Sequence, residues 1–155
     1  MAFSFTEKHA MSLLTPQLAP NERLLYRARG VEKPWYSRIF SRFGSLFWRN
    51  YLVAATDQRI LFVQHGGLFS GFAAKKVDAL PWHEVDRTQL GWGIFNKNLA
   101  VRSQARGFAK TVVLGRFWMK GNFPAAEGMV QTWTQSRGAL SGGPAAAGAL
   151  PQYRR

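Results

Sequence analysis

The chain has 155 residues, 46% hydrophobic and 14% aromatic, enough for one domain with a hydrophobic core and additional segments. A net charge of +13 favours anionic partners, which include acidic lipid, nucleic acid and an acidic protein face. The absence of cysteine excludes disulfides and thiolate metal sites and fits a reducing compartment. No apolar run approaches the roughly 18 residues of a transmembrane helix, and the N-terminus lacks the apolar region of a signal peptide. We therefore expect a cytoplasmic protein, peripheral at the inner membrane surface if it contacts lipid.

The first elements in chain order are a short helix and a run of strands. Residues 5–18 predict a helix with Thr6 as its N-cap. Turn residues such as Asp57, Pro81 and Gly107 divide the next part of the chain into short segments. We expect strands at 23–31, 51–55, 59–64, 75–80, 82–90, 94–103 and 108–117.

The last predicted element is a helix that begins at Asn122, a good N-cap, and carries Met129, Val130 and Trp133 on one side. About seven antiparallel strands followed by one helix predict a mainly β fold, a sandwich or small barrel with the helix over one open end. We divide the chain into an N-terminal helical extension (1–19), the main domain (20–137) and an Ala/Gly/Pro-rich tail expected to be disordered (138–155).

Residues 33–50, here called the basic aromatic segment, form an insertion between the first two strands. On a helix its aromatic and aliphatic side chains, with the exception of Trp48, share one broad face, and its arginines and serines share the other. That pattern is typical of an element at a membrane surface or a partner surface. The alternative is that the apolar face packs on the protein's own core, as most amphipathic helices do. The segment could also be a long irregular loop, because Gly44 and the aromatic residues lower helix propensity.

The order of elements resembles the pleckstrin-homology (PH)-like fold, particularly the small bacterial PH-like domains. The resemblance covers about residues 20–137 and is carried by NERLLYRARG at 21–30, YLVAATDQRILFV at 51–63, KKVDALPWHEVDRT at 75–88 and the final helix with Trp133. It implies two near-orthogonal antiparallel sheets capped by the C-terminal helix, and a binding module for phosphoinositides or peptides. Lipid-binding members commonly use basic residues of the first inter-strand loop, which here is the basic aromatic segment. Its bases are spread over a long stretch, unlike the compact pattern of phosphoinositide-binding members.

The candidate binding residues follow from the basic aromatic segment and its expected neighbours. The lipid- or partner-binding residues are Lys33, Trp35, Arg38, Phe40, Arg42, Phe43, Phe47 and Arg49, joined by Lys75 and Lys76 if these lie near the same rim. A second basic patch, without acidic residues, is expected around the turn at Gly107 and consists of Arg102, Arg106 and Lys110. The tip of residues 65–74 is either a hydrophobic insertion loop or a loop folded back on the barrel.

Catalysis, a metal site and a cofactor are not expected. The eight carboxylates are scattered, and the histidines lack metal-ligand spacing. Glu84 and Asp86 would share one face of a strand, an acid/base or metal pair in principle, but a solvated strand face explains them better. We therefore expect a non-enzymatic PH-like module that contacts anionic membrane lipid. The alternatives are a protein-interaction or assembly subunit, self-association included, and, third, non-specific nucleic-acid binding.

Overall fold

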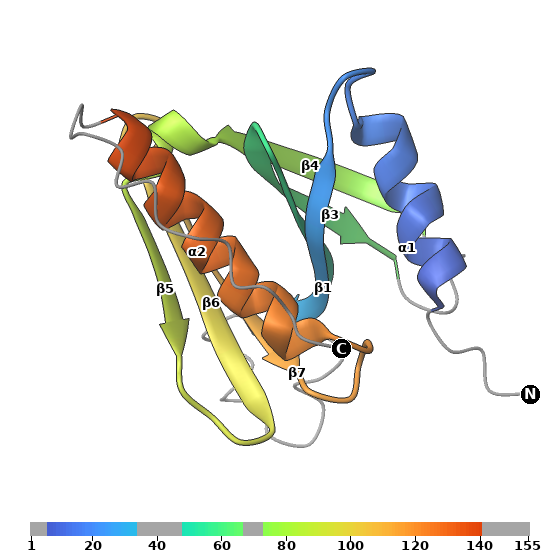
Figure 1. The fold of residues 1–155 in the computed structure, drawn as a ribbon. Coiled ribbons are helices and arrows are strands. Elements are labelled where there is room, and N and C mark those ends of the chain that lie inside the picture. Colours follow the sequence, from blue (N-terminus) through green and yellow to red (C-terminus); the bar gives the residue numbers. More distant parts are fainter. Residues whose placement is uncertain (1–5, 34–47, 67–72, 141–155) are drawn as a thin grey trace, which may run out of the picture.

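The computed structural model describes residues 6–33, 48–66 and 73–140, which form seven antiparallel strands and two α-helices (Figure 1). The helices are α1 (Glu7–Leu14) and α2 (Asn122–Leu140). The strands are β1 (Leu24–Glu32), β2 (Arg49–Thr56), β3 (Arg59–His65), β4 (Ala74–Pro81), β5 (Arg87–Gly91), β6 (Asn96–Ser103) and β7 (Phe108–Gly115). Two short 3-10 turns, η1 (Thr15–Gln17) and η5 (Trp82–Glu84), complete the elements. The expected strand order and C-terminal helix are confirmed.

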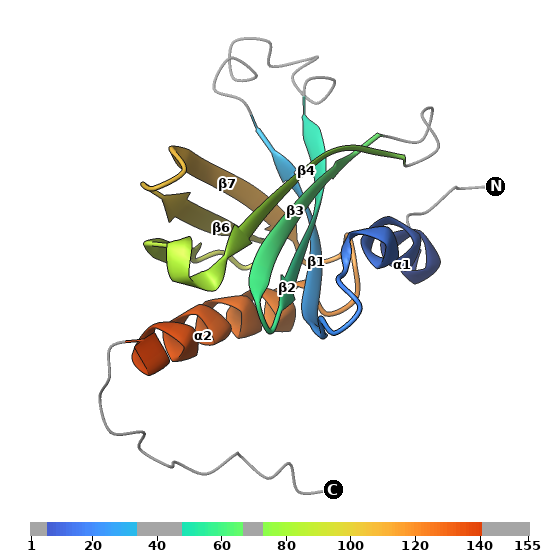
Figure 2. The same ribbon diagram turned by 90° about the horizontal axis from the view of Figure 1, so that it is seen from above.

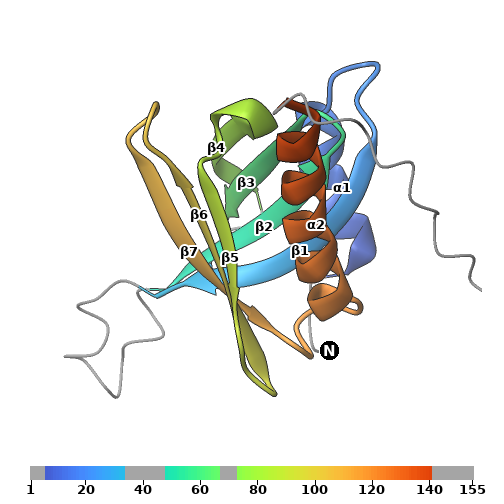
Figure 3. The same cartoon turned by 60° about the vertical axis from the view of Figure 1, so that its left-hand side comes forward.

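The seven strands form one sheet in the order β4-β3-β2-β1-β7-β6-β5, rather than two separate sheets. Its two halves are joined where β1 meets β7, through only the pairs Gly30–Leu114 and Val31–Val113. So short a junction lets one half of the sheet fold across the other. The two halves therefore face a common core, over which α2 lies (Figure 3).

Two hydrophobic clusters explain why β2 and β3 are apolar on both faces. The inner cluster contains side chains of both sheet halves and of α2, including Phe62, Leu99 and Met129. The outer cluster joins Leu14 and other α1 side chains to the opposite face of β2 and β3, for example at Leu52. Figure 2 shows α1 and α2 on different sides of this half of the sheet. The N-terminal helix is thus part of the folded unit, because it covers apolar surface that would otherwise face water.

A buried ion pair fastens the chain after α1 to the turn between β2 and β3. The carboxylate of Glu22 is fully buried and accepts hydrogen bonds from Arg59 Nε at 2.7 Å and Nη2 at 2.6 Å. It also accepts from the Thr56 hydroxyl at 2.7 Å and the Ala19 amide at 2.9 Å. The hydrogen bonds from Arg59 lower the pKa of Glu22 from 4.5 to about 2, against the opposing effect of burial. Arg59 also donates to the carbonyl of Gln17 at 2.9 Å, so η1 is held at the same place.

Two predicted elements depart from the observed bounds by more than two residues. The N-terminal helix ends at Leu14 rather than residue 18, because Pro16 lacks the amide hydrogen that the next helical turn would need, and η1 follows. The predicted strand at 82–90 starts instead with η5, and β5 begins only at Arg87. Here the indole Nε1 of buried Trp82 donates to the carbonyl of Thr56 at 2.8 Å, which draws the chain toward the β2–β3 turn.

Helix α2 packs against β1, β5 and η5, as expected for a helix over one open side of the sheet. Trp133, predicted to be a core residue, packs against the inner cluster and donates from Nε1 to the Val85 carbonyl at 2.9 Å. Asn122 does not act as the expected N-cap. It is the first residue of α2, and its buried amide instead binds the backbone of β1 and the end of β7.

We expect Gly30→Ala to destabilise the protein by about 2 kcal/mol, because a methyl group at the β1–β7 junction overpacks a site with no free space. A Cβ atom there would lie 2.6 Å from the Val113 carbonyl oxygen and closer still to Val112. Urea unfolding measures the loss. Gly138→Ala is the matched control, since an added Cβ meets nothing within 4 Å and the residue lies in α2, where alanine is favoured. Equal stability of the two variants would contradict the expectation.

Candidate functional site

The core of the predicted binding segment lies outside the described residues. This applies to Trp35, Arg38, Phe40, Arg42, Phe43 and Phe47, and also to the aromatic residues of the 65–74 tip. The described candidates are Lys33 and Arg49, which flank the segment, and Lys75 and Lys76 at the start of β4. The expectations about an aromatic helical face therefore stay predictions.

Strand register places the four described candidates at one end of the sheet. Glu32 pairs with Arg49 across β1 and β2, and His65 pairs with both Asn50 and Ala74 across the next two strand pairs. Lys33 follows the end of β1, while Lys75 and Lys76 lie beside the end of β3. We call this region, with its residues Lys33, Arg49, Lys75 and Lys76, the strand-end site; in Figure 2 these ends of β1 to β4 lie at the top and upper right.

All four cations of the strand-end site are exposed, and two of them face nearby carboxylates. Arg49 lies 3.9 Å from Glu32, and Lys76 lies 3.3 Å from Asp78. Lys33 stacks over the ring of Trp48, with Nζ 4.6 Å from the ring centroid, and Lys75 forms no ion pair with a described residue. The site therefore presents a net positive rim beside an indole that already contacts a cation.

The structure only partly groups the predicted second basic patch. Arg102 and Lys110 line a shallow hollow together with Arg87. Arg106 instead binds Glu84, with Nη2 3.1 Å from Oε1. Gly107 does form the expected turn, in a left-handed conformation.

Lys110 holds the two halves of the sheet together. Its side chain is only 9% exposed, and Nζ donates to Asp78 of β4 at 2.8 Å and to the Tyr51 hydroxyl of β2 at 3.1 Å. Its ammonium also lies within cation–π distance of the rings of Tyr51, Phe62 and Phe108. Burial alone would lower the pKa of Lys110, but the hydrogen bonds to Asp78 and Tyr51 outweigh it and raise the pKa. Its main role is thus structural, and it leaves little charge for a ligand.

The carboxylates of Glu84 and Asp86 are used within the fold. Because Glu84 lies in η5, the two residues do not share a strand face as predicted. Glu84 binds Arg106, and Asp86 accepts a hydrogen bond from the backbone amide of Gln104. Across residues 6–33, 48–66 and 73–140, no group of histidine and carboxylate side chains is arranged to hold a metal ion. In the same ranges no helix is long and apolar enough to cross a membrane.

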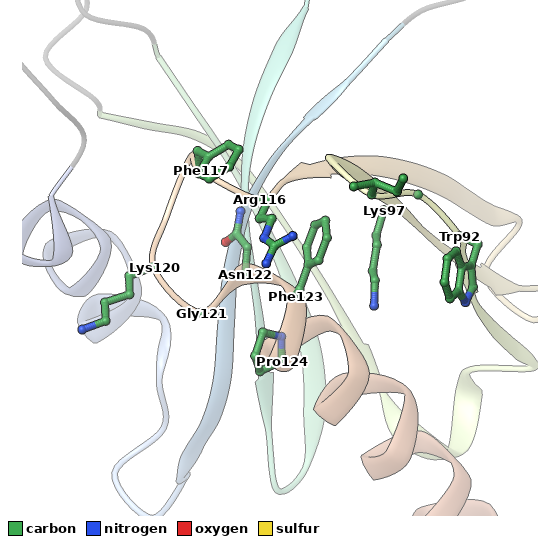
Figure 4. Close-up of a pocket in the computed structure, with 11 residues that line it drawn as sticks. Trp92, Lys97, Arg116, Phe117, Lys120, Gly121, Asn122, Phe123 and Pro124 are labelled. Carbon is green, nitrogen blue, oxygen red and sulfur yellow. The ribbon is translucent and has the colours of Figure 1, made fainter.

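A cleft beside the start of α2 was missed by the sequence reasoning. It has a volume of about 740 Å³ and lies between the β5–β6 turn and the β7–α2 turn. We call it the α2 cleft; its walls include Trp92, Ile94, Lys97, Arg116, Phe117 and Lys120. In Figure 4 the cleft extends from Lys120 to Trp92, and the ring of Phe123 lies between the side chains of Arg116 and Lys97. Only the glycines on both sides of Trp92 could have indicated an exposed aromatic turn from sequence.

Two solved structures resemble the chain in fold, and a third is a weaker match. The hSac2 domain of the human phosphoinositide phosphatase Sac2 is similar over 97% of this chain and 98% of its own, with a TM-score of 0.52 and 9% identity. The C-terminal domain of an unknown protein from Leishmania infantum has a TM-score of 0.50 and 13% identity, covering 83% of this chain and 97% of its own. A duf1696 family protein with a pleckstrin-homology domain from Shewanella loihica PV-4 has a TM-score of 0.47 and 13% identity, covering 84% and 92%.

The family is established by comparing the amino-acid sequence with models of protein families. No curated protein matches the chain. However, the family model described as bacterial PH domain matches residues 18–115, more than half of the sequence, from the end of η1 to the end of β7. The chain therefore belongs to the bacterial PH domain family.

Proposed function

We propose that this chain binds anionic phospholipid surfaces through the strand-end site and the basic aromatic segment that leaves the sheet there. PH-like domains commonly mediate binding to lipids or proteins. The observation that carries the proposal is the gathering of Lys33, Arg49 and the pair Lys75–Lys76 at one end of the sheet. The described ends of the basic aromatic segment, after Glu32 and before Arg49, lie side by side at this rim, so contacts made by that segment's bases and aromatic residues would add to those of the four cations.

The expected strength follows from the number of charges. Each lysine or arginine near an acidic leaflet contributes about 1 kcal/mol, so the four cations supply about 4 kcal/mol and a Kd near 1 mM. The ion pairs to Glu32 and Asp78 reduce the contributions of Arg49 and Lys76. Each inserted aromatic side chain of the basic aromatic segment would add about 1.5–3 kcal/mol before ordering costs. Micromolar binding therefore requires both charge and insertion.

We expect the triple variant Lys33→Ser, Lys75→Ser, Lys76→Ser to weaken binding to acidic vesicles by roughly 100-fold, because about 3 kcal/mol of local attraction is lost. Co-sedimentation with vesicles of phosphatidylserine and phosphatidylcholine at physiological salt measures the change. The matched control is Lys8→Ser, Arg23→Ser, Arg87→Ser, which removes the same charge at exposed positions in α1, before the start of β1 and in β5. Equal losses in both variants would mean that net charge alone attracts the protein, and the strand-end site would be rejected.

Two further readouts separate lipid from the alternative partners. The double variant Phe40→Asp, Phe43→Asp is expected to abolish vesicle binding and leave the urea midpoint unchanged. Unfolding of this variant would instead assign the segment's apolar face to the core. An absence of vesicle binding combined with salt-sensitive retardation of DNA or RNA in a gel would favour nucleic acid. If the protein bound neither vesicles nor nucleic acid, the remaining interpretation would be a protein-interaction subunit.

A further inference from the structure

Six large hydrophobic side chains are exposed among the described residues: Leu25, Tyr26, Trp92, Ile94, Phe95 and Phe117. All of them except Phe95 line two adjoining hollows around the start of α2. Trp92 is 94% exposed and Phe117 80%. The two that lie on β1 line a hollow that shares Lys120, Gly121 and Pro124 with the α2 cleft. Single exposed apolar residues are ordinary on protein surfaces, but a contiguous patch marks an interaction site.

The two turns that carry this patch are fixed relative to one another. The backbone amide of Arg116 donates to the carbonyl of Phe95 at 2.9 Å, which ties the β7–α2 turn to the β5–β6 turn. Trp118 packs directly on Gly115, so its ring anchors the start of the β7–α2 turn. The aromatic side chains are therefore presented by a braced surface, which reduces the ordering cost of binding.

The charges of the α2 cleft are all positive. Lys97, Arg116 and Lys120 line it, and no carboxylate does. Lys97 is paired with Glu127 and lies 5.0 Å from the centroid of the Phe123 ring. Arg116 and Lys120 form no ion pair with any carboxylate in the described ranges. A ligand of this cleft would therefore combine negative charge with apolar bulk.

We propose that the α2 cleft docks an acidic segment of another protein that carries at least one bulky apolar side chain. A second copy of this chain is a poor occupant, because its net charge of +13 would repel. The chain's own residues 141–155 end in two arginines and contain no acid, so they lack the complementary charge. Figures 2 and 3 show α2 away from the end of β1 and the start of β2, where the strand-end site lies. The inference does not depend on lipid binding, but a protein held at a bilayer by the strand-end site would keep this cleft accessible.

The test is selection from a phage-displayed library of random peptides on the full-length protein. We expect the enriched peptides to carry Asp or Glu beside Phe, Trp, Leu or Ile. Measured by biolayer interferometry, synthetic copies should bind the double variant Trp92→Ser, Phe117→Ser at least about tenfold more weakly, as for loss of aromatic anchors. Lys120→Glu should weaken binding several-fold, and Arg102→Glu, at an exposed cation on β6, should not. Unchanged urea midpoints would show that the exposed substitutions leave the fold intact.

The proposal is overturned if no peptide is enriched, if the enriched peptides lack acidic residues, or if they bind the Trp92→Ser, Phe117→Ser variant as well as the wild type. It is also overturned if this variant loses co-sedimentation with acidic vesicles as fully as the Lys33, Lys75, Lys76 triple variant does. In that case the α2 cleft would be a bilayer contact. Failure of the triple variant to affect vesicle binding would instead count only against the strand-end site.

Discussion

Replacing Glu22 with glutamine is expected to destabilise the protein by about 3 kcal/mol at neutral pH. The carboxylate accepts hydrogen bonds from both Nε and Nη2 of Arg59. In glutamine one of the two oxygens is replaced by an NH₂ group, which is itself a donor and cannot accept from Arg59. Arg59 would then keep a partly buried charge without its partner. Because Arg59 also holds the Gln17 carbonyl, the loss should loosen η1 as well as the β2–β3 turn. Urea unfolding at pH 7 measures the change.

Because of the ion pair between Glu22 and Arg59, we expect the free energy of unfolding to depend on pH. The pKa of Glu22 is about 2 in the folded protein against an ordinary value of 4.5, so the unfolded chain takes up the proton first as pH falls. The contribution of Glu22 is therefore fully present above pH 4.5 and is lost as the pH falls toward 2. The difference in unfolding free energy between the wild type and Glu22→Gln should shrink over that window.

Glu7→Gln is the matched control for this prediction. Glu7 also pairs with an arginine, Arg27, but its carboxylate is largely exposed, and exposed pairs contribute about 0–1 kcal/mol. Arg59→Lys should recover little of the stability, because an ammonium cannot reproduce the two-point contact of a guanidinium. If Glu22→Gln costs no more than Glu7→Gln, or if its deficit is the same at pH 7 and pH 3, the structural role assigned to this pair is wrong.

The strand order was predictable because its determinants are local. Turn residues such as Asp57 and Gly107 mark the ends of strands, and the predicted segments fall within a few residues of the observed ones. The error at 82–90 arose because Trp82 bonds to Thr56, a contact between residues that are distant in sequence. The role of α1 was also hidden, because β2 and β3 are buried on both faces only once that helix is in place.

The sites were less predictable than the fold. Sequence patterns left open whether Lys75 and Lys76 lie near the ends of the basic aromatic segment, because that depends on the register of β1 to β4, which places them beside the end of β3. They could not show that Lys110 is enclosed by aromatic rings and Asp78, because its partners come from β2 and β4. The α2 cleft depends on two turns that are about 20 residues apart in sequence and meet through one backbone hydrogen bond at Arg116.

Asn122→Ala is expected to cost about 3 kcal/mol, although the sequence suggested no more than a helix cap. Asn122 is 1% exposed; its Oδ1 accepts from the Arg29 amide at 2.9 Å, and its Nδ2 donates to the carbonyls of Arg29 and Gly115 at 2.8 Å each. The pairing of β1 with β7 stops at Gly30 and Leu114. The Asn122 side-chain amide therefore takes the place of the next pair of backbone hydrogen bonds, between Arg29 and Gly115. Alanine would remove all three of these hydrogen bonds; the Gly115 carbonyl would keep only the amide of Trp118 at 3.3 Å, and each lost bond to a buried backbone group costs about 1–3 kcal/mol before relaxation.

Asn122→Asp distinguishes this role from simple packing, because aspartate keeps the shape and the Oδ1 acceptor but places a second oxygen against two carbonyls. We expect it to be at least as destabilising as Asn122→Ala at pH 7. Burial among carbonyls raises the pKa of a carboxyl, so protonation restores one donor, and stability should recover as the pH falls through that raised pKa toward about 4, the ordinary pKa of aspartate. Asn122→Ala has no such group, and its deficit should stay constant with pH. Asn21→Ala, at an exposed asparagine, is the control and should change stability by less than about 0.5 kcal/mol. If Asn122→Asp and Asn122→Ala show the same deficit at pH 7 and pH 4, the amide does not extend the ladder between β1 and β7, and the short junction at Gly30 must hold the two halves of the sheet without it.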